Sequence, residues 1–292
     1  MTARRRLVKV PASSANLGPG YDVLAAALAL QLELEVEEAG SFSVDADGLD
    51  VPLDRSNLCV RAFEALRPAT EIAFRIKSEI PPAAGLGSSA AAIVAGLMAA
   101  DHLYELALEP QDVLVRAAEI EGHPDNVAAA LYGGFVICGQ DGGGVAATRL
   151  DPPQGVEGIV VIPGEQVPTE EARMALPDEV PLADAVANIS AASDLVLGIE
   201  RSDLTLIGRG LADRLHQPHR AHLYPRSMEV VAEAPRMGAI GATISGAGPT
   251  VLVWTFWQST GDVVKKLAER VGDWAEVRRV PFSPTGADVP EL

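Results

Sequence analysis

The residues best suited to chemistry in this chain of 292 residues form a glycine-rich loop at positions 81–91, with the sequence PPAAGLGSSAA. Gly85 and Gly87 let backbone N–H groups approach a ligand closely, and an apolar helix is expected to follow at about 88–106. Unpaired N–H groups and the positive end of a helix dipole together form an anion site, for which a polyphosphate is the natural guest. A glycine turn before a capped helix has the same composition, so the residues alone leave both interpretations open.

Two common nucleotide-binding patterns are absent from the sequence. No lysine follows a glycine anywhere in the chain, which argues against a P-loop nucleoside triphosphatase. The pair Gly85 and Gly87 lacks the third glycine of a dinucleotide-binding fingerprint, and the glycines at 238–241 and 245–248 also fail its spacing. A polyphosphate at this loop would therefore be bound in another way.

Three glycine- and serine-rich segments occur in order along the chain. They are PASSANLGPGYD at 11–22, PAAGLGSSAA at 82–91 and SGAGPT at 245–250. Together they resemble the motifs of the GHMP kinases, a family of small-molecule kinases that act on galactose, homoserine, mevalonate and phosphomevalonate. The resemblance implies ATP as co-substrate and an ATP-binding set that comprises Asn57, Pro81, Pro82, Ala83, Ala84, Gly85, Leu86, Gly87, Ser88, Ser89, Ala90 and Ala91.

Further details resemble the branch of the family that acts on homoserine. They are Asn16 and Asp22 in the first motif, EGHPDN at 121–126, TEEAR at 169–173 and QPHR at 217–220. Mevalonate kinases instead have an aspartate base after a Pro-Ser-Gly stretch. The resemblance implies ATP-dependent phosphorylation of the hydroxyl of L-homoserine to O-phospho-L-homoserine, in threonine biosynthesis. The alternatives are another GHMP kinase with a mevalonate-like or sugar-alcohol substrate, and a non-catalytic binding protein of the same fold.

The side chains of these motifs suit a small zwitterion such as homoserine. A carboxylate is matched by an arginine fork, for which Arg173 and Arg220 are the candidates. An ammonium group needs a carboxylate partner, which Asp22 offers, with Asn16 as a neutral acceptor. We therefore expect these four residues to bind the amino-acid part of the substrate.

The reacting hydroxyl is expected to lie near His123 and Asn126. Phosphoryl transfer depends mainly on positioning and charge stabilisation, so a side-chain base is optional. The resemblance implies that Asn126 orients the hydroxyl while the γ-phosphate takes its proton, and Asp125 is the carboxylate nearest in sequence. Thr169 and Arg173 share a face if they are helical, because they are four residues apart, and with Asn126 they form the expected catalytic set.

Magnesium is expected because phosphoryl transfer needs a metal between the terminal phosphates. Mg²⁺ takes few protein ligands, often one carboxylate with phosphate and water oxygens. The resemblance suggests Ser89 and Glu119 as ligands, with Glu121 as a close rival because both glutamates lie in the same short stretch. A surface position for either glutamate is the alternative.

Three histidines recur at intervals of three residues: His216, His219 and His222. Their spacing could suggest a metal site, but Pro218 is expected to break a regular helix there and no cysteine lies nearby. We interpret them as histidines at the surface or flanking the site.

Composition narrows the partners and the compartment. The chain has 40 acidic and 23 basic side chains and a formal net charge of -17, which argues against nucleic acids and anionic membranes as partners. Its basic N-terminal run is not followed by an apolar segment typical of a secretory signal, so a cytoplasmic protein is expected. Cys59 and Cys138 have apolar neighbours and are expected to be buried thiols. The resemblance implies a homodimer.

Hydrophobic patterns predict the elements that position these residues. Strands are predicted at 7–10, 30–37, 71–77, 133–139, 158–162, 241–244, 251–256 and 276–280, and helices at 57–66, 88–106, 110–122, 169–176, 182–199, 204–215 and 261–271. The first strand is expected to stop at Pro11, with a turn over 12–20, and a hairpin loop is expected at 141–144.

A Pro- and Gly-rich linker at 151–155 divides the pattern into two predicted domains, 1–155 and 156–292. Strands and helices mix in both halves, which predicts an α/β (α+β) two-layer fold. The resemblance implies the GHMP kinase fold, with an N-terminal α/β domain that binds ATP, a C-terminal ferredoxin-like domain, and the active site between them.

Overall fold

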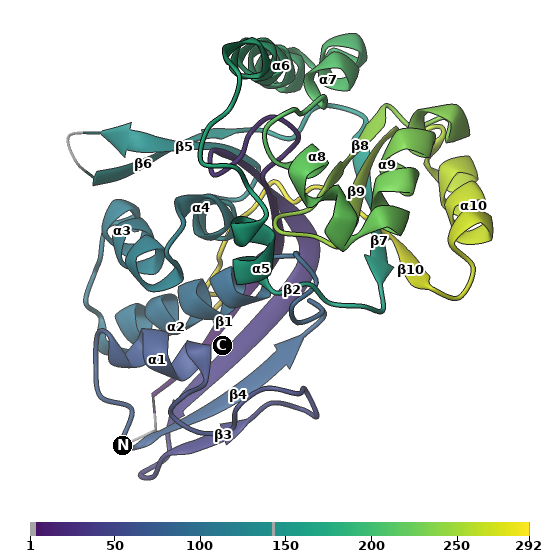
Figure 1. Ribbon diagram of the computed structural model, residues 1–292. Coiled ribbons are helices and arrows are strands. Elements are labelled where there is room, and N and C mark those ends of the chain that lie inside the picture. Colours follow the sequence, from purple (N-terminus) through teal and green to yellow (C-terminus); the bar gives the residue numbers. More distant parts are fainter. Residues whose placement is uncertain (1–3, 142–143, 292) are drawn as a thin grey trace.

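Two β-sheets organise the protein in this computed structural model, which describes residues 4–141 and 144–291 (Figure 1). The first sheet has six strands in the order β3-β4-β2-β5-β6, with β1 paired to β2, and the second has the order β10-β7-β9-β8. The strands are β1 (Arg5–Ala15), β2 (Leu24–Glu38), β3 (Ser43–Asp45), β4 (Ile72–Ser78), β5 (Phe135–Asp141), β6 (Gly144–Leu150), β7 (Val156–Pro163), β8 (Gly241–Ile244), β9 (Val251–Phe256) and β10 (Ala275–Val280). Each predicted strand is present, and β3 and β6 are additional. The mixed α/β class is confirmed.

The long strand β2 confirms the alternating pattern that predicted it. Leu30, Leu32, Leu34 and Val36 are buried, while the side chains between them are only partly buried. The strand begins earlier than predicted because residues 25–28 are all fully buried and their sequence does not alternate.

Strand β1 continues beyond Pro11, so the predicted turn over 12–20 is wrong for its first residues. The register against β2 shifts just after Pro11, and pairing then continues to Ala15. A proline is tolerated at such an irregularity because no ladder bond depends on its nitrogen. The extension brings the first motif to the central loop, where the N–H of Ser13 donates to the carbonyl oxygen of Leu86 over 3.1 Å.

Four helices lie on one face of the first sheet (Figure 1). They are α1 (Leu58–Glu64), α2 (Ser88–Tyr104), α3 (Pro110–Glu121) and α4 (Pro124–Tyr132). Helix α4 was not predicted, because it starts directly after α3. Gly122 ends α3 with a left-handed backbone (φ 88°), and Pro124 then opens α4, a position where its missing N–H costs nothing.

The second half contributes six α-helices: α5 (Thr169–Met174), α6 (Leu182–Arg201), α7 (Leu204–Gly210), α8 (Gln217–Arg220), α9 (Pro225–Met237) and α10 (Thr260–Val271). Helices α8 and α9 were not predicted, since α8 has only four residues and α9 buries only three of its side chains. The predicted helix at 204–215 ends at Gly210, because the Asp213 carboxylate bonds the backbone N–H groups of the next residues into a turn. Pro218 lies at the start of α8 instead of breaking a helix.

One apolar core contains residues of both sheets, and a second, smaller cluster joins the second sheet to α9 and α10. Phe135, Trp254 and Phe282 form an aromatic cluster with ring centroids 4.8–5.5 Å apart, and all three are buried. The connection at 151–155 joins β6 to β7 and includes the predicted domain boundary. After β10 the chain returns to the first sheet, where Lys9 pairs with Asp288. The segment after β10 therefore lies in the second predicted domain by its sequence position, but it contacts the first sheet.

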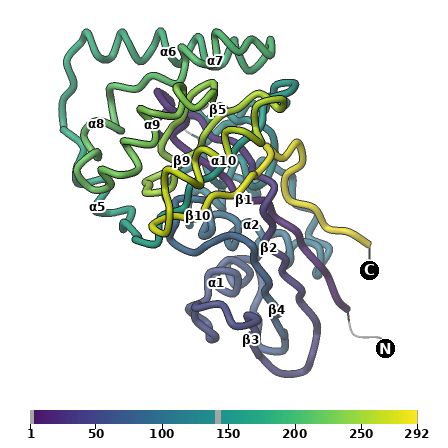
Figure 2. Tube along the Cα trace, turned by 90° about the vertical axis from the view of Figure 1, so that its right-hand side faces the viewer, coloured from purple at the N-terminus to yellow at the C-terminus, as the bar shows by residue number. Residues whose placement is uncertain are grey.

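Helices α6 and α7 lie together at the end of the molecule opposite β3 (Figures 1 and 2). Within the described residues, α6 is the one helix that is long and apolar enough to cross a membrane, judged by length and composition alone. Of its most apolar stretch of 18 residues, 28% is buried. Its exposed apolar side chains include Leu182, Val186 and Ile189, which are three or four residues apart. Helix α6 therefore presents an apolar stripe at the surface.

The remaining expectations on single elements can be placed directly. Asp141 and Gly144 pair at the ends of the predicted hairpin loop, and residues 142–143 lie outside the described residues. Cys59 and Cys138 are buried free thiols, as predicted, and burial raises the pKa of each to about 12.

Candidate active site

A cavity of about 690 Å³ receives residues from both halves of the chain. Its wall includes the turn after β1, the starts of α1 and α2, the junction of α3 and α4, helices α5 and α8, and the loop after β8. All three sequence motifs are therefore brought to one place. They are also bonded to each other: the Ser245 hydroxyl donates to the Gly85 carbonyl oxygen over 2.6 Å and can accept from the Ser14 hydroxyl, 2.8 Å away.

The N-terminus of α2 is open toward this cavity. Gly87 caps the helix with a left-handed backbone (φ 68°), no side chain bonds to the first N–H groups, and the first turn has no acidic residue. Ser88 and Ser89 of that turn line the cavity. Free N–H groups at the positive end of a 17-residue helix form an anion site, as the loop composition suggested.

The two glycines of the loop are required by close contacts. A Cβ atom on Gly85 would lie 2.5 Å from the Ser245 carbonyl oxygen, and one on Gly87 would lie 2.0 Å from the Ser13 hydroxyl. Both glycines also have positive φ, which side chains rarely adopt. The loop can therefore lie against the first and third motifs only as a glycine loop.

Most of the predicted ATP-binding residues line the cavity. They are Asn57, Pro82, Ala83, Ala84, Gly85, Gly87, Ser88 and Ser89. The other predicted residues, Pro81, Leu86, Ala90 and Ala91, are not part of its wall; Leu86 and both alanines are buried in the apolar core. Asn57 caps α1, where its side chain accepts from the Cys59 N–H over 3.0 Å.

The predicted metal ligands are separated by the structure. The Ser89 hydroxyl donates to Glu121 Oε1 over 2.5 Å, and both residues line the cavity. Glu119 is exposed on α3 and is not part of the wall, because residues two apart on a helix point in nearly opposite directions. Glu121, the rival, is the carboxylate beside Ser89. Burial raises its pKa, and the Ser89 hydrogen bond acts in the opposite direction. These two oxygen donors could hold a hard cation such as Mg²⁺.

Asn126 and Asp125 start α4 at the centre of the cavity wall. The Ser13 hydroxyl donates to Asn126 Oδ1 over 2.8 Å, so the amide NH₂ of Asn126 is the group left for a ligand. Asp125 is only 2% exposed, and burial raises its pKa to about 6. Its Oδ1 accepts from the Asn126 N–H over 2.7 Å, which favours the charged form and limits the rise.

His123 and Thr169 also line the cavity, from the caps of α4 and the start of α5. Burial lowers the pKa of His123, and the nearby charge of Arg173 lowers it further, so the imidazole is held toward its neutral form. Thr169 and Arg173 lie four residues apart on α5 and both reach the wall, as their spacing predicted.

Arg173 and Asp22, which were expected to bind opposite charges of the substrate, bind each other. Arg173 Nη2 lies 2.8 Å from Asp22 Oδ1, and Nη1 lies 3.2 Å from Oδ2. Nη1 also donates to the Tyr21 hydroxyl over 2.7 Å. The buried Nε of Arg173 has no hydrogen-bond partner among the residues that the structure describes.

Asn16 lines the cavity but both ends of its side-chain amide are already engaged. Oδ1 accepts from the Asp22 N–H over 2.8 Å, and Nδ2 donates to the Gly246 carbonyl oxygen over 2.9 Å. Asn16 therefore connects the loop that carries Asp22 to the third motif. In this geometry both ends of its amide bond to backbone groups of the protein.

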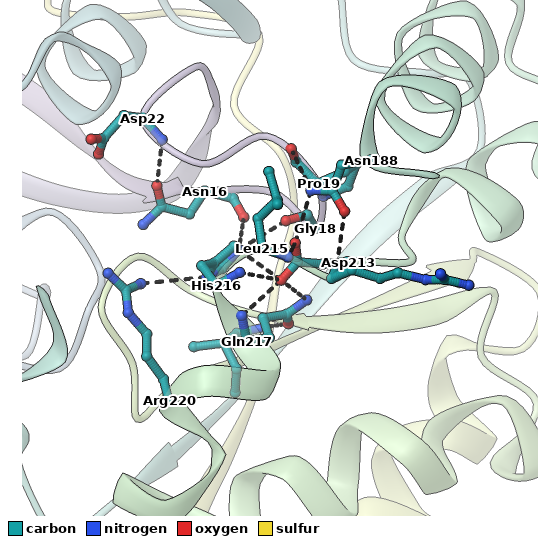
Figure 3. Close-up of polar contacts among 12 residues, drawn as sticks. Asn16, Gly18, Pro19, Asp22, Asn188, Asp213, Leu215, His216, Gln217 and Arg220 are labelled. Carbon is teal, nitrogen blue, oxygen red and sulfur yellow. Dashed lines mark hydrogen bonds and ion pairs between the residues drawn. The ribbon is translucent and has the colours of Figure 1, made fainter. Parts of the chain in front are cut away.

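Arg220 is 1% exposed, yet it lines the cavity. Its Nε donates to the Ala172 carbonyl oxygen over 2.7 Å, and its guanidinium lies 5.1 Å from the centroid of the Tyr21 ring. Figure 3 shows this guanidinium beside His216, whose Nδ1 is 3.4 Å from Nη1. A buried guanidinium held by fixed partners is suited to binding a carboxylate.

The histidines divide between the two positions expected for them, since two lie at the surface and His216 lies beside Arg220 of the cavity wall. His219 and His222 are exposed, whereas His216 is 0% exposed. Among the described residues no cluster of metal-ligating side chains is found, and the three histidines do not form one. Their spacing of three residues has no helical meaning here, because α8 contains only the second of them.

Sequence reasoning missed three residues that hold this site together: Ser13, Tyr21 and His216. Ser13 and Tyr21 lie inside the first motif, so their place in it was a usable signal. The contacts of His216 join residues 200 positions apart in sequence, and no local pattern indicates them.

Two family models match segments of the chain that contain the second and third motifs. The model of the GHMP kinases N terminal domain matches residues 57–134, and that of the GHMP kinases C terminal domain matches residues 195–276. The chain is 41% identical over 256 residues to the homoserine kinase of Moorella thermoacetica, which covers 85% of this chain and 86% of that protein. It is 40% identical over 294 residues to the homoserine kinase of Streptomyces avermitilis, which covers 97% and 94%.

Solved structures show the same fold over nearly the whole chain. The homoserine kinase of Cytophaga hutchinsonii superposes with a TM-score of 0.88 at 28% identity and covers 98% of each chain. The L. major mevalonate kinase superposes with a TM-score of 0.70 at 17% identity, covering 98% of this chain and 97% of that one, which is a likeness of fold.

Proposed function

The chain belongs to the GHMP kinase family, and we propose that it transfers the γ-phosphoryl group of ATP to the hydroxyl of L-homoserine. The product would be O-phospho-L-homoserine, in threonine biosynthesis. One observation carries the proposal: a single cavity is lined by an open helix N-terminus, here called its nucleotide end, and by a carboxylate, Asp22, with two arginines, Arg173 and Arg220, here called its amino-acid end. The first end suits a polyphosphate and the second suits a zwitterion.

At the nucleotide end, the phosphates of ATP would lie against the first N–H groups of α2. The base would lie where the cavity wall is apolar, near Leu49, Val51 and Ile76. Ser89 and Glu121 would hold Mg²⁺, and their two oxygen donors suit this hard cation. When bound, the metal supplies neutralisation of the negative charge shared by the terminal phosphates.

At the amino-acid end, Asp22 would bind the substrate ammonium and Arg220 its carboxylate. Asp22 and Arg173 now neutralise each other, and their side chains are 35% and 34% exposed. Binding of an ammonium group at Asp22 would therefore release Arg173 toward negative charge on the substrate or the γ-phosphate. Thr169, one helical turn before Arg173, would place a hydroxyl beside the same phosphate.

Asn126 would orient the attacking hydroxyl through its amide NH₂, since its Oδ1 is held by Ser13. The hydroxyl proton would pass to the γ-phosphate, because positioning and charge stabilisation supply most of the catalysis. We expect Asn126→Ala to lower kcat about 10- to 100-fold, the scale of a lost hydrogen bond to a charged or reacting group, and to change the KM for homoserine less. Steady-state kinetics would test this, and a raised KM with unchanged kcat would contradict a role in the chemical step.

A coupled assay for ADP release tests the proposed reaction directly. With ATP and Mg²⁺, we expect turnover with L-homoserine and much less with mevalonate or galactose. The reverse preference would assign another GHMP kinase activity. Binding of nucleotide without turnover of any of the three would indicate a binding protein, and calorimetric titration with a non-hydrolysable ATP analogue would show it.

We also propose that the protein is a cytoplasmic homodimer that binds neither nucleic acids nor membranes. The support is the family resemblance and the excess of acidic side chains, 40 against 23 basic ones. Light scattering should give twice the chain mass of 30.5 kDa. A mass of one chain at micromolar concentration would contradict the dimer.

A further inference from the structure

His216 is fully buried between the first motif and Arg220. It immediately precedes α8, and its ring lies 5.6 Å from the Tyr21 ring, centroid to centroid. Figure 3 shows it between the loop of Asn16 and Gly18 on one side and the Arg220 guanidinium on the other. A fully buried histidine between a backbone loop and a substrate-binding arginine invites a chemical explanation.

The partners of the ring determine where its proton lies. Nε2 is 2.8 Å from the Gly18 carbonyl oxygen and 3.2 Å from the Asn16 carbonyl oxygen. Carbonyl oxygens only accept, so Nε2 carries the hydrogen. Nδ1 is 3.4 Å from Arg220 Nη1, and a guanidinium only donates, so Nδ1 is the acceptor. These contacts fit only the neutral imidazole with its hydrogen on Nε2.

The charges around His216 support the neutral form. Burial lowers its pKa, and the charge of Arg220 lowers it further, while Asp213 and the two carbonyl groups oppose this. Asp213 lies 3.5 Å from Nε2, but its carboxylate accepts from the N–H groups of Leu215 and Gln217 and from the Asn188 amide. The Asp213 carboxylate is thus stabilised by several neutral hydrogen-bond donors and does not need a charged imidazolium as its partner.

Arg220 is fixed by contacts at two of its nitrogens. Nε donates to the Ala172 carbonyl oxygen and Nη1 faces His216 Nδ1, while the Tyr21 ring covers the guanidinium. Because the guanidinium is planar, two such contacts determine the plane of the whole group. Its remaining N–H groups are then presented to the cavity that Arg220 lines.

We propose that His216 is a positioning residue: as a neutral acceptor it holds the Arg220 guanidinium in the plane that receives the carboxylate of the amino-acid substrate. This inference rests on the proposed function. It assigns a role to a residue that the sequence placed only at the surface or beside the site.

Two substitutions test the roles of the two ring nitrogens of His216 separately. In His216→Asn, the side-chain oxygen can take the place of Nδ1 and accept from Arg220. In His216→Gln, the longer amide can donate to the Gly18 carbonyl oxygen in place of Nε2, but no acceptor faces Arg220. Kinetics would be measured with ATP and L-homoserine, with 3-aminopropan-1-ol as a competitive inhibitor, since it has the same alcohol and ammonium without the carboxylate.

We expect His216→Gln to raise the KM for L-homoserine roughly 10- to 100-fold, the scale of a hydrogen bond to a charged group. The KM for ATP and the inhibition constant of 3-aminopropan-1-ol should stay at wild-type values, and His216→Asn should retain most of the homoserine affinity. An equal loss for all three ligands would overturn the proposal in favour of a structural role, and so would an unchanged KM in His216→Gln. Loss in His216→Asn with wild-type thermal unfolding would also overturn it.

A spectroscopic readout needs no variant. The imidazole ¹⁵N shifts of His216 in the wild-type protein should show a neutral ring protonated at Nε2 at pH 7. A charged ring, or a hydrogen on Nδ1, would overturn the proposal even if the variants did not fold. If the wild-type enzyme did not use L-homoserine, the proposed function would fail, while this measurement would still test the contact between His216 and Arg220.

Discussion

The two ends of the cavity are built from different parts of the chain. The nucleotide end is made largely of backbone: the N–H groups of α2, and two glycines that lie against the Ser245 carbonyl oxygen and the Ser13 hydroxyl. The amino-acid end is made of side chains, with Asp22, Arg173 and Arg220 arranged around Tyr21. Under the proposed function, the first end would bind the nucleotide in the space that the glycines leave open, and the second would bind the amino acid through fixed charges.

This difference predicts how each end fails. Adding atoms should damage the nucleotide end, because its contacts leave no room. Removing charges should damage the amino-acid end, because buried partners are then left unpaired. Substitutions that affect one ligand and spare the other would support the comparison, and equal effects on both ligands would break it.

The largest effect is expected from Arg220→Ala. It removes a 1% exposed guanidinium and should weaken homoserine recognition by about 2–5 kcal/mol, with the KM for ATP little changed. Initial-rate kinetics at varied homoserine would measure it. The matched control is Arg226→Ala, which removes an exposed arginine that lies over the Trp274 ring outside the cavity. Unchanged kcat and KM in Arg220→Ala would remove this residue from the site.

Asp125 lies between the two ends and should make stability depend on pH. Burial raises its pKa from 3.8 to about 6 in the folded protein, so the folded state holds the proton more tightly than the unfolded state. The cost of Asp125 to stability therefore grows as the pH rises from about 4 to about 6, and it stays constant at higher pH. Asp125→Asn should stabilise the protein by up to about 3 kcal/mol at pH 8, and the gain should shrink toward pH 5.

Urea unfolding of the wild type and of Asp125→Asn at both pH values would measure this difference. Asp178→Asn is the control, because Asp178 is exposed in the loop before α6. A difference that is the same at pH 5 and pH 8 would contradict the assignment, since it would not come from titration of Asp125.

Gly85→Ala should damage the nucleotide end alone. The new Cβ would lie 2.5 Å from the Ser245 carbonyl oxygen at a φ of +77°, and relief of this strain should cost about 1–3 kcal/mol. We expect a weaker affinity for an ATP analogue in calorimetric titration and an almost unchanged KM for homoserine. Gly164→Ala is the matched control, because nothing lies within 4 Å of its Cβ position. Equal losses for both ligands would show that the two ends are not separable.

The same difference explains how much of the protein could be predicted from its sequence. The nucleotide end could be predicted because its glycine loop and the helix after it are contiguous in sequence. Positions 82–89 line the cavity except for Leu86. Strands could be predicted where only one face is buried, as in β2, because their apolar residues then alternate with polar ones. Strand β1 beyond Pro11 and helix α9 were missed, because their local patterns do not show the contacts that stabilise them.

For the amino-acid end, the sequence predicted which residues take part but not how they contact each other. Arg173, Arg220 and Asp22 were identified, but the ion pair between the first and the last joins residues 151 positions apart. The choice between Glu119 and Glu121 depended on the rotation of α3, which a single sequence does not define to one residue. The sequence did not decide whether His216 lies at the surface or beside the site, because its contacts reach residues about 200 positions away.

The smallest effect on folding is expected where the amino-acid end is most open. Asp22 and Arg173 are about one-third exposed, so their ion pair should contribute less than about 1 kcal/mol to the unfolding free energy. Asp22→Asn keeps a neutral acceptor of the same size, and its urea midpoint should stay near that of the wild type. The KM for homoserine should still rise about tenfold, because a charge-assisted bond to the ammonium is lost, while the KM for ATP should not. If Asp22→Asn instead unfolded much more easily with an unchanged KM for homoserine, the pair would be a structural link between the turn after β1 and helix α5, and the charges of this end would not select the substrate.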